Sequence, residues 1–412
     1  MSKSRPHAIM TTIRLTPEEE KHICDETAMK ARCCVARMDA PEEYLVTFEF
    51  LNKGAANVVF KLHPWSPISS ITPCLFIDFD SGSKAARPVH RQHVINQVVR
   101  VPRGLSKHLS SEEIIDGFEH AIRPLFLPGN HETVSMTSVP RTNSGTSVQK
   151  ASIPIDQDFT KHLMDHQGVL LLPEVMEHLV NESKEDTFGN SGPGRCLGIL
   201  LPDMSPLPGR SITLEIKPKW LSQSPNAPVN AVRCRTCAMQ VTVPKNRETY
   251  VCPLRLVHGG STSLRSWAHT MVTRQFGGHA HNSSTEPVIS SIISALLDYL
   301  TAGEGRDLLR HLLKLQNALD AQGVLCRPPK GPLFDYNLRL AMTLRDCSLF
   351  VQVPYDAAAG RAIKSQITSK LADLDFKSAE KIEDWTDKER KLLDDGTYTA
   401  ASNGVDCWLK RV

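Results

Sequence analysis

Two kinds of hydrophobic spacing run through this chain and restrict the folds it can adopt. Every second residue is apolar or aromatic at Tyr44, Val46, Phe48 and Phe50, which predicts a strand with one buried face. Helical spacing replaces this alternation in residues 292–319, where leucines recur every three or four positions. The chain therefore combines strands and helices, and we expect the α+β class. Further strands are predicted at residues 58–60, 97–101, 196–201, 214–216, 349–351 and 367–374.

Local signals suggest how the chain is divided. Thr16-Pro17-Glu18 resembles a helix start, so residues 1–40 are predicted to form a helical extension. Ser110 or Ser111 is expected to cap a second helix, because two acids follow directly. The segment 132–152 is rich in Ser and Thr without an apolar period, which predicts a mobile loop. A proline-bounded crossing at 202–206 predicts an N-terminal lobe over residues 41–204 and a C-terminal lobe over residues 205–412.

Charge and hydrophobicity exclude several classes of protein. The 48 Lys and Arg residues and the 45 Asp and Glu residues leave a formal charge of +3, too little for a non-specific nucleic-acid binder. No apolar run approaches the roughly 20 residues of a membrane-spanning helix. The first residues, MSKSRPHAIM, lack the apolar core of a secretory signal, so we expect the 11 cysteines to be reduced inside the cell.

Two features of the predicted N-terminal lobe suit a nucleotide. Gly54, Ala55 and Ala56 lie between two strands, where small residues let backbone amides approach phosphate oxygens. An ordinary hairpin turn explains the same residues. Arg100 lies among valines in a strand, where a buried cation needs an anionic partner. That partner is either a nucleotide phosphate or a carboxylate of the protein.

The strand around residue 215 presents two lysines together. Glu215, Lys217 and Lys219 project to one face, while Leu214 and Ile216 project to the other. Pro218 stiffens the exit of the strand, which suits the binding of a multiply charged anion. A solvated edge strand is the alternative interpretation.

Acidic residues flank two later strands. Asp346 precedes the strand at 347–351, and Asp373 and Asp375 follow the strand that ends near residue 372. Mg²⁺ needs only one or two protein carboxylates when nucleotide phosphates and water complete its shell. A magnesium site is therefore one interpretation, and surface acids at strand ends are the other.

Cys234, Cys237, Cys252 and His258 have the composition of a zinc site but irregular spacing. We interpret these cysteines as small buried thiols and keep zinc as the alternative.

Five short motifs follow one another in the second half of the chain: Glu215-Ile216-Lys217-Pro218-Lys219, Cys234-Arg235-Thr236-Cys237 with Gln240, Tyr250-Val251-Cys252-Pro253-Leu254, Arg345-Asp346-Cys347-Ser348 and Asp373-Leu374-Asp375-Phe376-Lys377. Taken in this order, they resemble the inositol-pentakisphosphate 2-kinase family. A looser likeness extends through 54–59 and 97–100, so the resemblance covers residues 44–398.

This resemblance implies a two-lobed, protein-kinase-like architecture with an antiparallel sheet in the N-terminal lobe and a mixed α/β C-terminal lobe. It implies an enzyme that uses ATP and Mg²⁺ to phosphorylate the 2-hydroxyl of inositol 1,3,4,5,6-pentakisphosphate. We expect a monomer, nuclear or cytoplasmic, with no membrane or direct nucleic-acid partner. An inactive inositol-phosphate-binding protein and a zinc-dependent nucleic-acid module are the alternatives.

The resemblance also implies roles for individual residues. Lys217 would stabilise the transferred phosphoryl group, and Asp346 would orient or deprotonate the attacking hydroxyl and hold Mg²⁺ with Asp373. We expect both lysines of the strand to face both acids in one cleft between the lobes. The residues expected to bind ATP are Gly54, Ala56, Asn57, Arg100, Asp203 and Met204. Those expected to bind inositol phosphates are Lys219, Arg235, Lys245, Lys377, Lys381 and Trp385.

The chain departs from the family pattern at several positions. Relatives usually have a glycine in place of Asn52, a histidine in place of Met239, an acid in place of Arg255 and a proline in place of Ser378. The asparagine-rich substrate segment of the family has no evident counterpart in 261–276. These departures motivate the inactive alternative.

Overall fold

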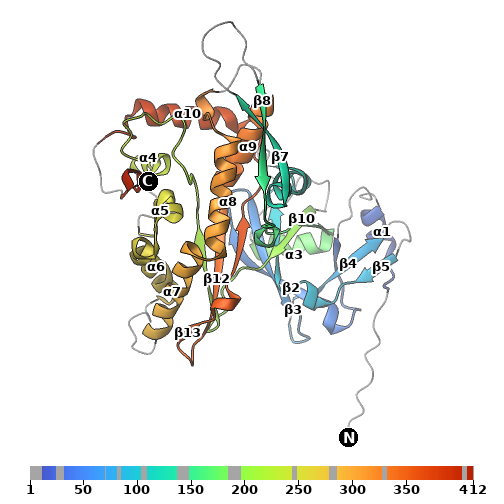
Figure 1. Ribbon diagram of the computed structural model, residues 1–412. Coiled ribbons are helices and arrows are strands. Elements are labelled where there is room, and N and C mark those ends of the chain that lie inside the picture. The colour runs from blue at the N-terminus through green and yellow to red at the C-terminus, as the bar shows by residue number, and fades with distance from the viewer. Residues whose placement is uncertain are drawn as a thin grey trace. The chain divides into compact units, whose positions relative to one another are not determined.

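The computed structural model describes residues 12–24, 32–69, 71–80, 85–103, 109–136, 148–183, 196–243, 248–277, 285–326, 332–400 and 406–411. The chain forms two compact units (Figure 1). The first comprises Met1–Gly117 and Met164–Asp203, and the second comprises Phe118–Leu163 and Met204–Val412. Both units contain helices and strands, which confirms the α+β class.

The first unit is built on a sheet in which β1, β9, β10, β6, β3, β2 and β4 pair in a closed ring, with β5 added beside β4. The sheet is mixed, so the prediction of an antiparallel sheet is wrong at one pair: β1 and β9 are parallel. These two strands are far apart in the sequence, so no tight turn has to reverse the chain between them. The strands are β1 (Arg32–Ala36), β2 (Leu45–Lys53), β3 (Asn57–Pro64), β4 (Cys74–Asp80), β5 (Ala85–Pro88), β6 (Gln97–Pro102), β9 (Gln167–Leu171) and β10 (Cys196–Pro202).

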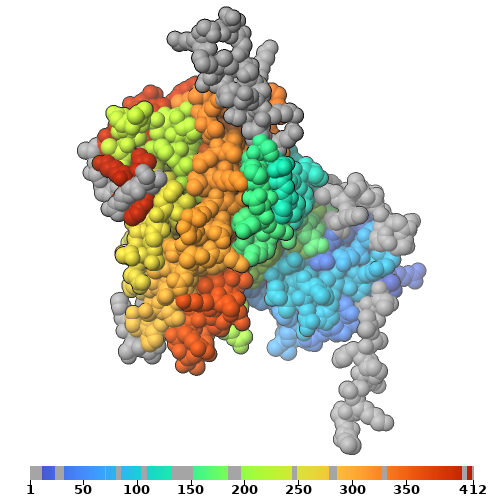
Figure 2. All heavy atoms as spheres, viewed as in Figure 1, coloured from blue at the N-terminus to red at the C-terminus, as the bar shows by residue number. Residues whose placement is uncertain are grey.

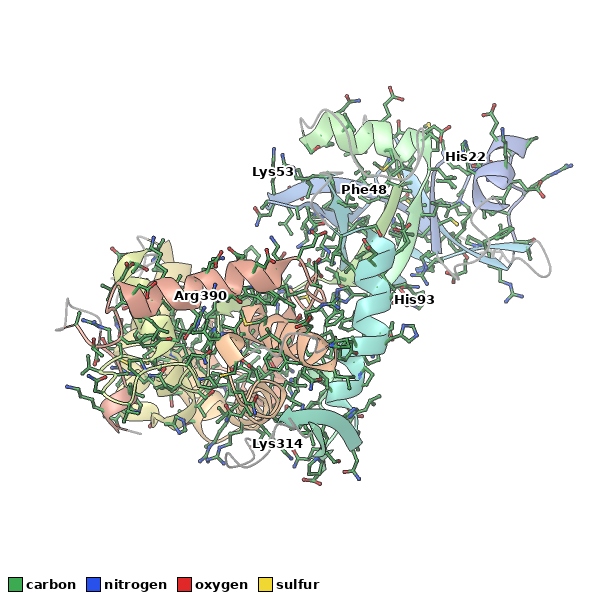
Figure 3. The ribbon with its side chains drawn as sticks, turned by 90° about the horizontal axis from the view of Figure 1, so that it is seen from above. His22, Phe48, Lys53, His93, Lys314 and Arg390 are labelled. Atoms are coloured by element: carbon green, nitrogen blue, oxygen red, sulfur yellow. The ribbon has the colours of Figure 1, made fainter. Side chains whose placement is uncertain are left out.

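Alternating side chains fill the interior of this sheet, as the sequence predicts. In β3 the buried residues are Val58, Phe60 and Leu62, with partly exposed residues between them. Phe48 of β2 packs against the ring of Phe60 with centroids 6.3 Å apart. Figure 3 shows Phe48 within the strands and Lys53 at the end of β2. Burial of these aromatic rings stabilises the unit by roughly 2 kcal/mol each.

Capping boxes begin two helices of the first unit. The backbone N–H of Glu19 donates to Thr16 Oγ1, and the N–H of Thr16 donates to the Glu19 carboxylate. Ser110 and Glu113 make the same reciprocal pair. The prediction of helix throughout residues 1–40 is wrong, because β1 follows the first helix and buries Cys34 in the sheet. The helices are α1 (Pro17–Cys24), α2 (Ser111–Gly117) and α3 (Pro173–Ser183).

Two small sheets belong to the second unit. In the first, β12 (Ser348–Asp356) pairs antiparallel with β11 (Ser211–Ile216), β13 (Arg361–Ala362) and β14 (Thr368–Ala372). In the second, β7 (Gly129–Met136) pairs with β8 (Val148–Ile155). The prediction of a loop over 132–152 is therefore wrong for the described ends of that segment. Backbone hydrogen bonds set this ribbon, and they need no apolar period.

Helices supply most of the core of the second unit. Ile292, Leu296 and Leu308 are at most 1% exposed, as the helical spacing predicts. Figure 2 shows α8 beside the β7–β8 ribbon, and the Lys314 ammonium (Figure 3) donates to the Pro154 carbonyl of β8. The helices are α4 (Arg235–Thr242), α5 (Pro253–His258), α6 (Ser261–Gln275), α7 (Glu286–Thr301), α8 (Glu304–Leu319), α9 (Pro332–Asp346) and α10 (Lys381–Asp394).

The observed division of the chain differs from the predicted lobes, and the largest difference concerns residues 118–163. Residues 118–163 belong to the second unit, although the sequence places them in the N-terminal lobe. Phe118, Ile122 and Phe126 explain the difference, because they are buried in the same core as the leucines of α7 and α8. Across the described residues, no helix combines the length and the apolar character that crossing a bilayer requires.

Candidate active site

Three strand ends of the second unit meet at one edge of its sheet. Because β12 runs antiparallel to both neighbours, its first residue lies beside the last residues of β11 and β14. Ile216 pairs with Leu349, and Ser348 pairs with Ala372. The residues that follow or precede these ends are Lys217, Asp373 and Asp346, so the topology gathers charges separated by more than 120 positions in the sequence.

The cations and acids at this edge contact one another directly. Lys217 Nζ lies 2.8 Å from Glu215 Oε1 and 3.1 Å from Asp373 Oδ2. Asp346 forms ion pairs with two lysines. Lys219 Nζ lies 2.9 Å from its Oδ1, and Lys377 Nζ lies 2.9 Å from its Oδ2. We call these six residues, Glu215, Lys217, Lys219, Asp346, Asp373 and Lys377, the charged edge.

The electrostatics of the charged edge favour the ionised forms of Asp346 and Lys217. Burial alone would raise the pKa of Asp346, but the charges of Lys377 and Lys219 outweigh it and lower the pKa to about 2. Burial alone would lower the pKa of Lys217, but the hydrogen bond to Glu215 and the charge of Asp373 raise it. At neutral pH Asp346 is therefore a carboxylate suited to a cation, and Lys217 is an ammonium group suited to phosphate.

Two residues of the charged edge have an unusual backbone. Lys219 has φ 52° and Asp373 has φ 57°, and within the described segments these are the two non-glycine residues with positive φ. This left-handed conformation costs an L-residue about 1 kcal/mol or more. Its occurrence at both positions indicates that side-chain placement here outweighs local backbone preference.

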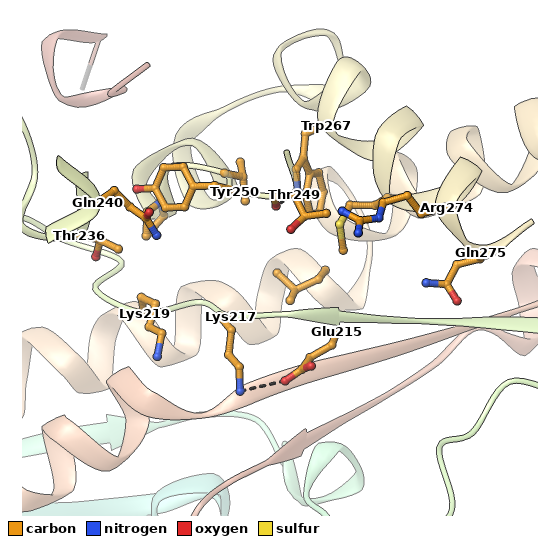
Figure 4. A pocket seen from close by; sticks show the side chains of 14 residues that line it. Glu215, Lys217, Lys219, Thr236, Gln240, Thr249, Tyr250, Trp267, Arg274 and Gln275 are labelled. Carbon is orange, nitrogen blue, oxygen red and sulfur yellow. Dashed lines mark hydrogen bonds and ion pairs between the residues drawn. The ribbon is translucent and has the colours of Figure 1, made fainter. Parts of the chain in front are cut away.

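A cavity of about 430 Å³ opens beside β11. Figure 4 shows Glu215, Lys217 and Lys219 along one side, with Tyr250 and Trp267 opposite. The wall opposite β11 comes from α4, α6 and the segment before α5, and its described residues include Thr236, Gln240, Thr249, Tyr250, Trp267, Met271, Arg274 and Gln275. The size suits a ligand of sugar-phosphate dimensions, and the lysines supply positive charge on one side.

Comparison with known proteins agrees with this geometry. The sequence profile of the inositol-pentakisphosphate 2-kinase family matches residues 50–391. This chain belongs to that family. It is 30% identical over 239 residues to the inositol-pentakisphosphate 2-kinase of Yarrowia lipolytica, covering 53% of this chain and 70% of that relative. The predicted family is thereby confirmed, and the chain is a phosphotransferase of inositol phosphate metabolism.

Of the residues predicted to bind inositol phosphates, Lys377 belongs to the charged edge and Lys381 lies at the surface. Lys377 pairs with Asp346, and the described Lys381 is exposed at the first turn of α10. Lys245 lies outside the described residues. The cavity is lined by Lys217 and Lys219 but not by the other predicted site residues that the structure describes.

Arg235 and Trp385, both predicted to bind the substrate, are buried and packed against other residues of the protein. Arg235 Nε donates to Glu389 Oε2 at 2.6 Å, and its guanidinium lies 4.3 Å from the ring centroid of Trp220. Trp385 is 8% exposed and packs in an apolar cluster with Trp220 and Met342. These contacts stabilise the wall behind the charged edge, and a role of either residue in substrate binding stays a prediction.

The residues predicted to bind ATP belong mainly to the first unit. Gly54 and Ala56 form the turn between β2 and β3, where the Gly54 N–H donates to the Asn57 carbonyl at 2.8 Å. The Arg103 guanidinium donates to the carbonyl of Ala55 at 3.2 Å, which fixes the turn. The chain thus forms a hairpin turn at this position, and phosphate binding by the turn stays a prediction.

The other residues predicted to bind ATP are Arg100, which lies in β6, and Asp203 and Met204, which follow β10. Arg100 of β6 is 7% exposed. Asp203 Oδ2 pairs with Lys61 Nζ at 2.8 Å, and its N–H donates to the Asn96 carbonyl. Met204 is the first residue of the segment Met204–Val412 of the second unit. The contact of Asp203 with Lys61 of β3 ties the end of β10 to the sheet of the first unit.

Four cysteines form a cluster behind the cavity wall. The Sγ atoms of Cys234, Cys237, Cys252 and Cys407 all lie within 4.8 Å of one another, and no disulfide joins them. A tetrahedron with zinc–sulfur bonds of about 2.3 Å has sulfur–sulfur edges of about 3.8 Å, and Cys234 Sγ lies 3.8 Å from Cys252 Sγ. Cys234, Cys237 and Cys252 are free and buried, as predicted, and the donor set that they form with Cys407 also fits the zinc alternative.

The sequence pointed to the wrong fourth member of this cluster. His258 is replaced by Cys407, which lies 155 positions after Cys252 near the end of the described chain. No spacing rule connects residues so far apart, and only the fold brings them together. The sequence also gave no role to Ser348, Tyr250 and Arg274, since isolated Ser, Tyr and Arg residues carry no signal by spacing.

Proposed function

We propose that this protein transfers the γ-phosphoryl group of ATP to the 2-hydroxyl of inositol 1,3,4,5,6-pentakisphosphate. Family membership gives the reaction class, and the charged edge is the observation that supports these roles for its residues. A pentakisphosphate carries about eight to ten negative charges. Lys217, Lys219 and Lys377 would bind part of that charge, and each charge-assisted contact contributes about 1.5–3 kcal/mol.

The low pKa of Asp346 favours one of its two predicted roles. A carboxylate of pKa about 2 accepts a hydrogen bond well but removes a proton poorly. Asp346 would therefore orient the 2-hydroxyl toward the phosphorus, which places the nucleophile without covalent help from the protein. Lys217 would stabilise the negative charge on the transferred group.

The donor set of the charged edge also suits magnesium. Asp346 and Asp373 both present half-exposed carboxyl groups, and Mg²⁺ accepts one or two carboxylate ligands together with phosphates and water. When bound, the ion would neutralise charge on the nucleotide phosphates. Lys217 and Lys219 would then be free to bind phosphate oxygens.

For the first unit we propose nucleotide binding at the β2–β3 turn, with Gly54, Ala56 and Asn57 near the phosphates and Arg100 beneath them. Asp203 and Met204 would lie by the adenine. We infer that the two units correspond to the two lobes of a protein-kinase-like fold. The predicted substrate roles of Arg235, Lys245, Lys381 and Trp385 remain part of this proposal.

The cysteine cluster supports a second cofactor. We propose that Cys234, Cys237, Cys252 and Cys407 hold a structural zinc ion with four thiolate ligands and no open position for catalysis. The cluster lies directly behind the cavity wall, because Cys237 Sγ contacts the Tyr250 hydroxyl at 3.1 Å and Tyr250 lines the cavity.

Incubation of the protein with Mg²⁺, ATP and inositol 1,3,4,5,6-pentakisphosphate tests the proposed reaction. We expect hexakisphosphate as the product, identified by ³¹P NMR through the new phosphate at position 2. Asp346→Asn should reduce turnover at least about 100-fold, whereas Asp387→Asn, on the exposed face of α10, should not change it. Binding of hexakisphosphate without any turnover by the wild-type protein would instead favour the inactive alternative.

A further inference from the structure

Ser348 is a buried hydroxyl at the centre of the charged edge. It is 0% exposed and begins β12, between the ends of β11 and β14. Its Oγ donates toward Asp373 Oδ2 at 2.7 Å and toward Glu215 Oε1 at 2.9 Å, and it accepts a hydrogen bond from Lys217 Nζ. One side-chain oxygen therefore contacts three charged residues of the site.

Hydrophobic packing does not explain why a serine is buried at position 348, because Ser348 lies on the face of the sheet opposite the core. Leu349, Val351 and Val353 alternate into the hydrophobic core and are 0% exposed. Ser348 points to the opposite face, which it shares with Glu215 of the neighbouring strand. Burial of a hydroxyl is unfavourable unless it is hydrogen-bonded, and here its three hydrogen-bond partners are charged side chains of the candidate site.

The hydrogen-bonding capacity of a hydroxyl decides what Ser348 can do. A serine has one proton and two lone pairs, and a lysine ammonium is a donor only. Ser348 must therefore accept from Lys217 and give its single proton to either Asp373 or Glu215. If Asp373 is engaged with a cation, the proton is still available to Glu215, and Lys217 keeps both the serine oxygen and the Glu215 carboxylate as partners.

We propose that Ser348 is a positioning residue for Lys217 in the phosphoryl-transfer reaction. The inference rests on the proposed function of the charged edge and adds a residue to it. Lys217 is a flexible side chain, and its ammonium group stabilises a transferring phosphoryl group only if it is held in place. Glu215 and Asp373 stabilise the protonated form of Lys217. The Ser348 hydroxyl holds the ammonium group in its position between these two side chains. Ser348 acts through Lys217 and need not touch either substrate.

Ser348→Ala tests this role, with Ser369→Ala as the matched control. Ser369 is a buried serine on the adjacent strand β14, and its hydroxyl bonds to His162 and Tyr299 rather than to the charged edge. We expect Ser348→Ala to lower kcat about 10- to 100-fold while the KM values for ATP and for the inositol phosphate change less than about threefold. Ser369→Ala should leave kcat unchanged, and thermal unfolding should show that both variants are folded.

A double-mutant cycle separates positioning from general damage. In a Lys217→Ala background, Ser348→Ala should cause no further loss of the residual activity, because its effect is transmitted through the missing lysine. Ser348→Thr, which keeps the hydroxyl, should restore most of the lost rate. A wild-type rate in Ser348→Ala, or an equal additional loss in the Lys217→Ala background, overturns the positioning role alone. Absence of phosphorylation by the wild-type protein overturns the proposed function itself.

Discussion

The ammonium group of Lys219 lies 2.9 Å from Oδ1 of Asp346, so a cation suited to bind phosphate is neutralised by an acid suited to orient a hydroxyl. Asp346→Asn should separate the two roles. It frees Lys219 and Lys377 from their carboxylate partner, so hexakisphosphate should bind about three- to tenfold more tightly at low salt, while turnover falls. Isothermal titration at two salt concentrations measures this affinity. Weaker binding by the variant would show that Asp346 contributes more to ligand contacts than to neutralising lysines.

The backbone of Lys219 gives a prediction that concerns stability. Lys219→Gly and Lys219→Ala both remove the ammonium group, so both should weaken inositol-phosphate binding to the same extent. Only glycine adopts φ 52° without strain, so the glycine variant should be more stable than the alanine variant by about 1 kcal/mol. Urea unfolding of the two variants measures the difference, and equal stabilities would mean that the loop relaxes to negative φ.

Local sequence patterns predicted the strands well, because burial of one face leaves a period of two. Val58, Phe60 and Leu62 of β3 show that period, and so do Leu349, Val351 and Val353 of β12. The β7–β8 ribbon was missed because its register depends on backbone hydrogen bonds and leaves no apolar pattern in 132–152. The parallel pairing of β1 with β9 was missed for a related reason, since no local signal joins strands so distant in the sequence.

The charged residues of the site could be named from the sequence, but their contacts could not. Strand ends identified Lys217, Asp346 and Asp373 as candidates, and the antiparallel order of β11, β12 and β14 then brought them together. Lys219 lies beyond the end of β11 at Ile216 and has a positive φ, so the alternation of a strand does not place its side chain, and its pairing with Asp346 could not be predicted. The position of Cys407 could not be predicted either, because only tertiary folding places it among the other three cysteines.

Loss of metal from the cysteine cluster should destabilise the second unit. Cys407→Ser removes one thiolate ligand and should lower the unfolding free energy by at least about 2 kcal/mol. Cys326→Ser, at an exposed cysteine outside the cluster, should have no effect. Metal analysis of the purified wild-type protein by plasma mass spectrometry should find about one zinc ion per chain. A stable, metal-free wild-type protein would contradict the zinc proposal.

Arg274 lines the cavity from α6, and its guanidinium is more than half exposed. A cation opposite Lys217 should contact phosphates of the inositol ring, so Arg274→Ala should raise KM for the inositol phosphate about three- to tenfold and leave KM for ATP unchanged. Arg265→Ala is the control, because Arg265 is exposed nine positions earlier on the same helix, which places it on the opposite side. An equal effect of both substitutions would indicate a general electrostatic effect rather than a contact.

Stability should fall as the pH decreases through the range in which His311 becomes protonated. Burial lowers the pKa of His311 to about 4, compared with 6.5 when exposed, and its Nε2–H donates to the Leu125 carbonyl at 2.8 Å. The unfolded chain therefore binds a proton more readily than the folded chain. The neutral histidine contributes stability that is fully present above about pH 6.5 and is lost as the pH falls to about 4, by up to about 3 kcal/mol.

His311→Gln removes this titration while keeping an amide that can donate to Leu125. Urea unfolding at pH 7.5 and pH 4.5 should show a smaller pH-dependent loss of stability in this variant than in the wild type. Some dependence should remain, because burial also lowers the pKa of His162. His269→Gln, at an exposed position of α6, should keep the wild-type dependence. If His311→Gln also kept it, protonation of other groups would have to account for the loss, and the stacked contact of His311 with Phe159 would not be what acid disrupts.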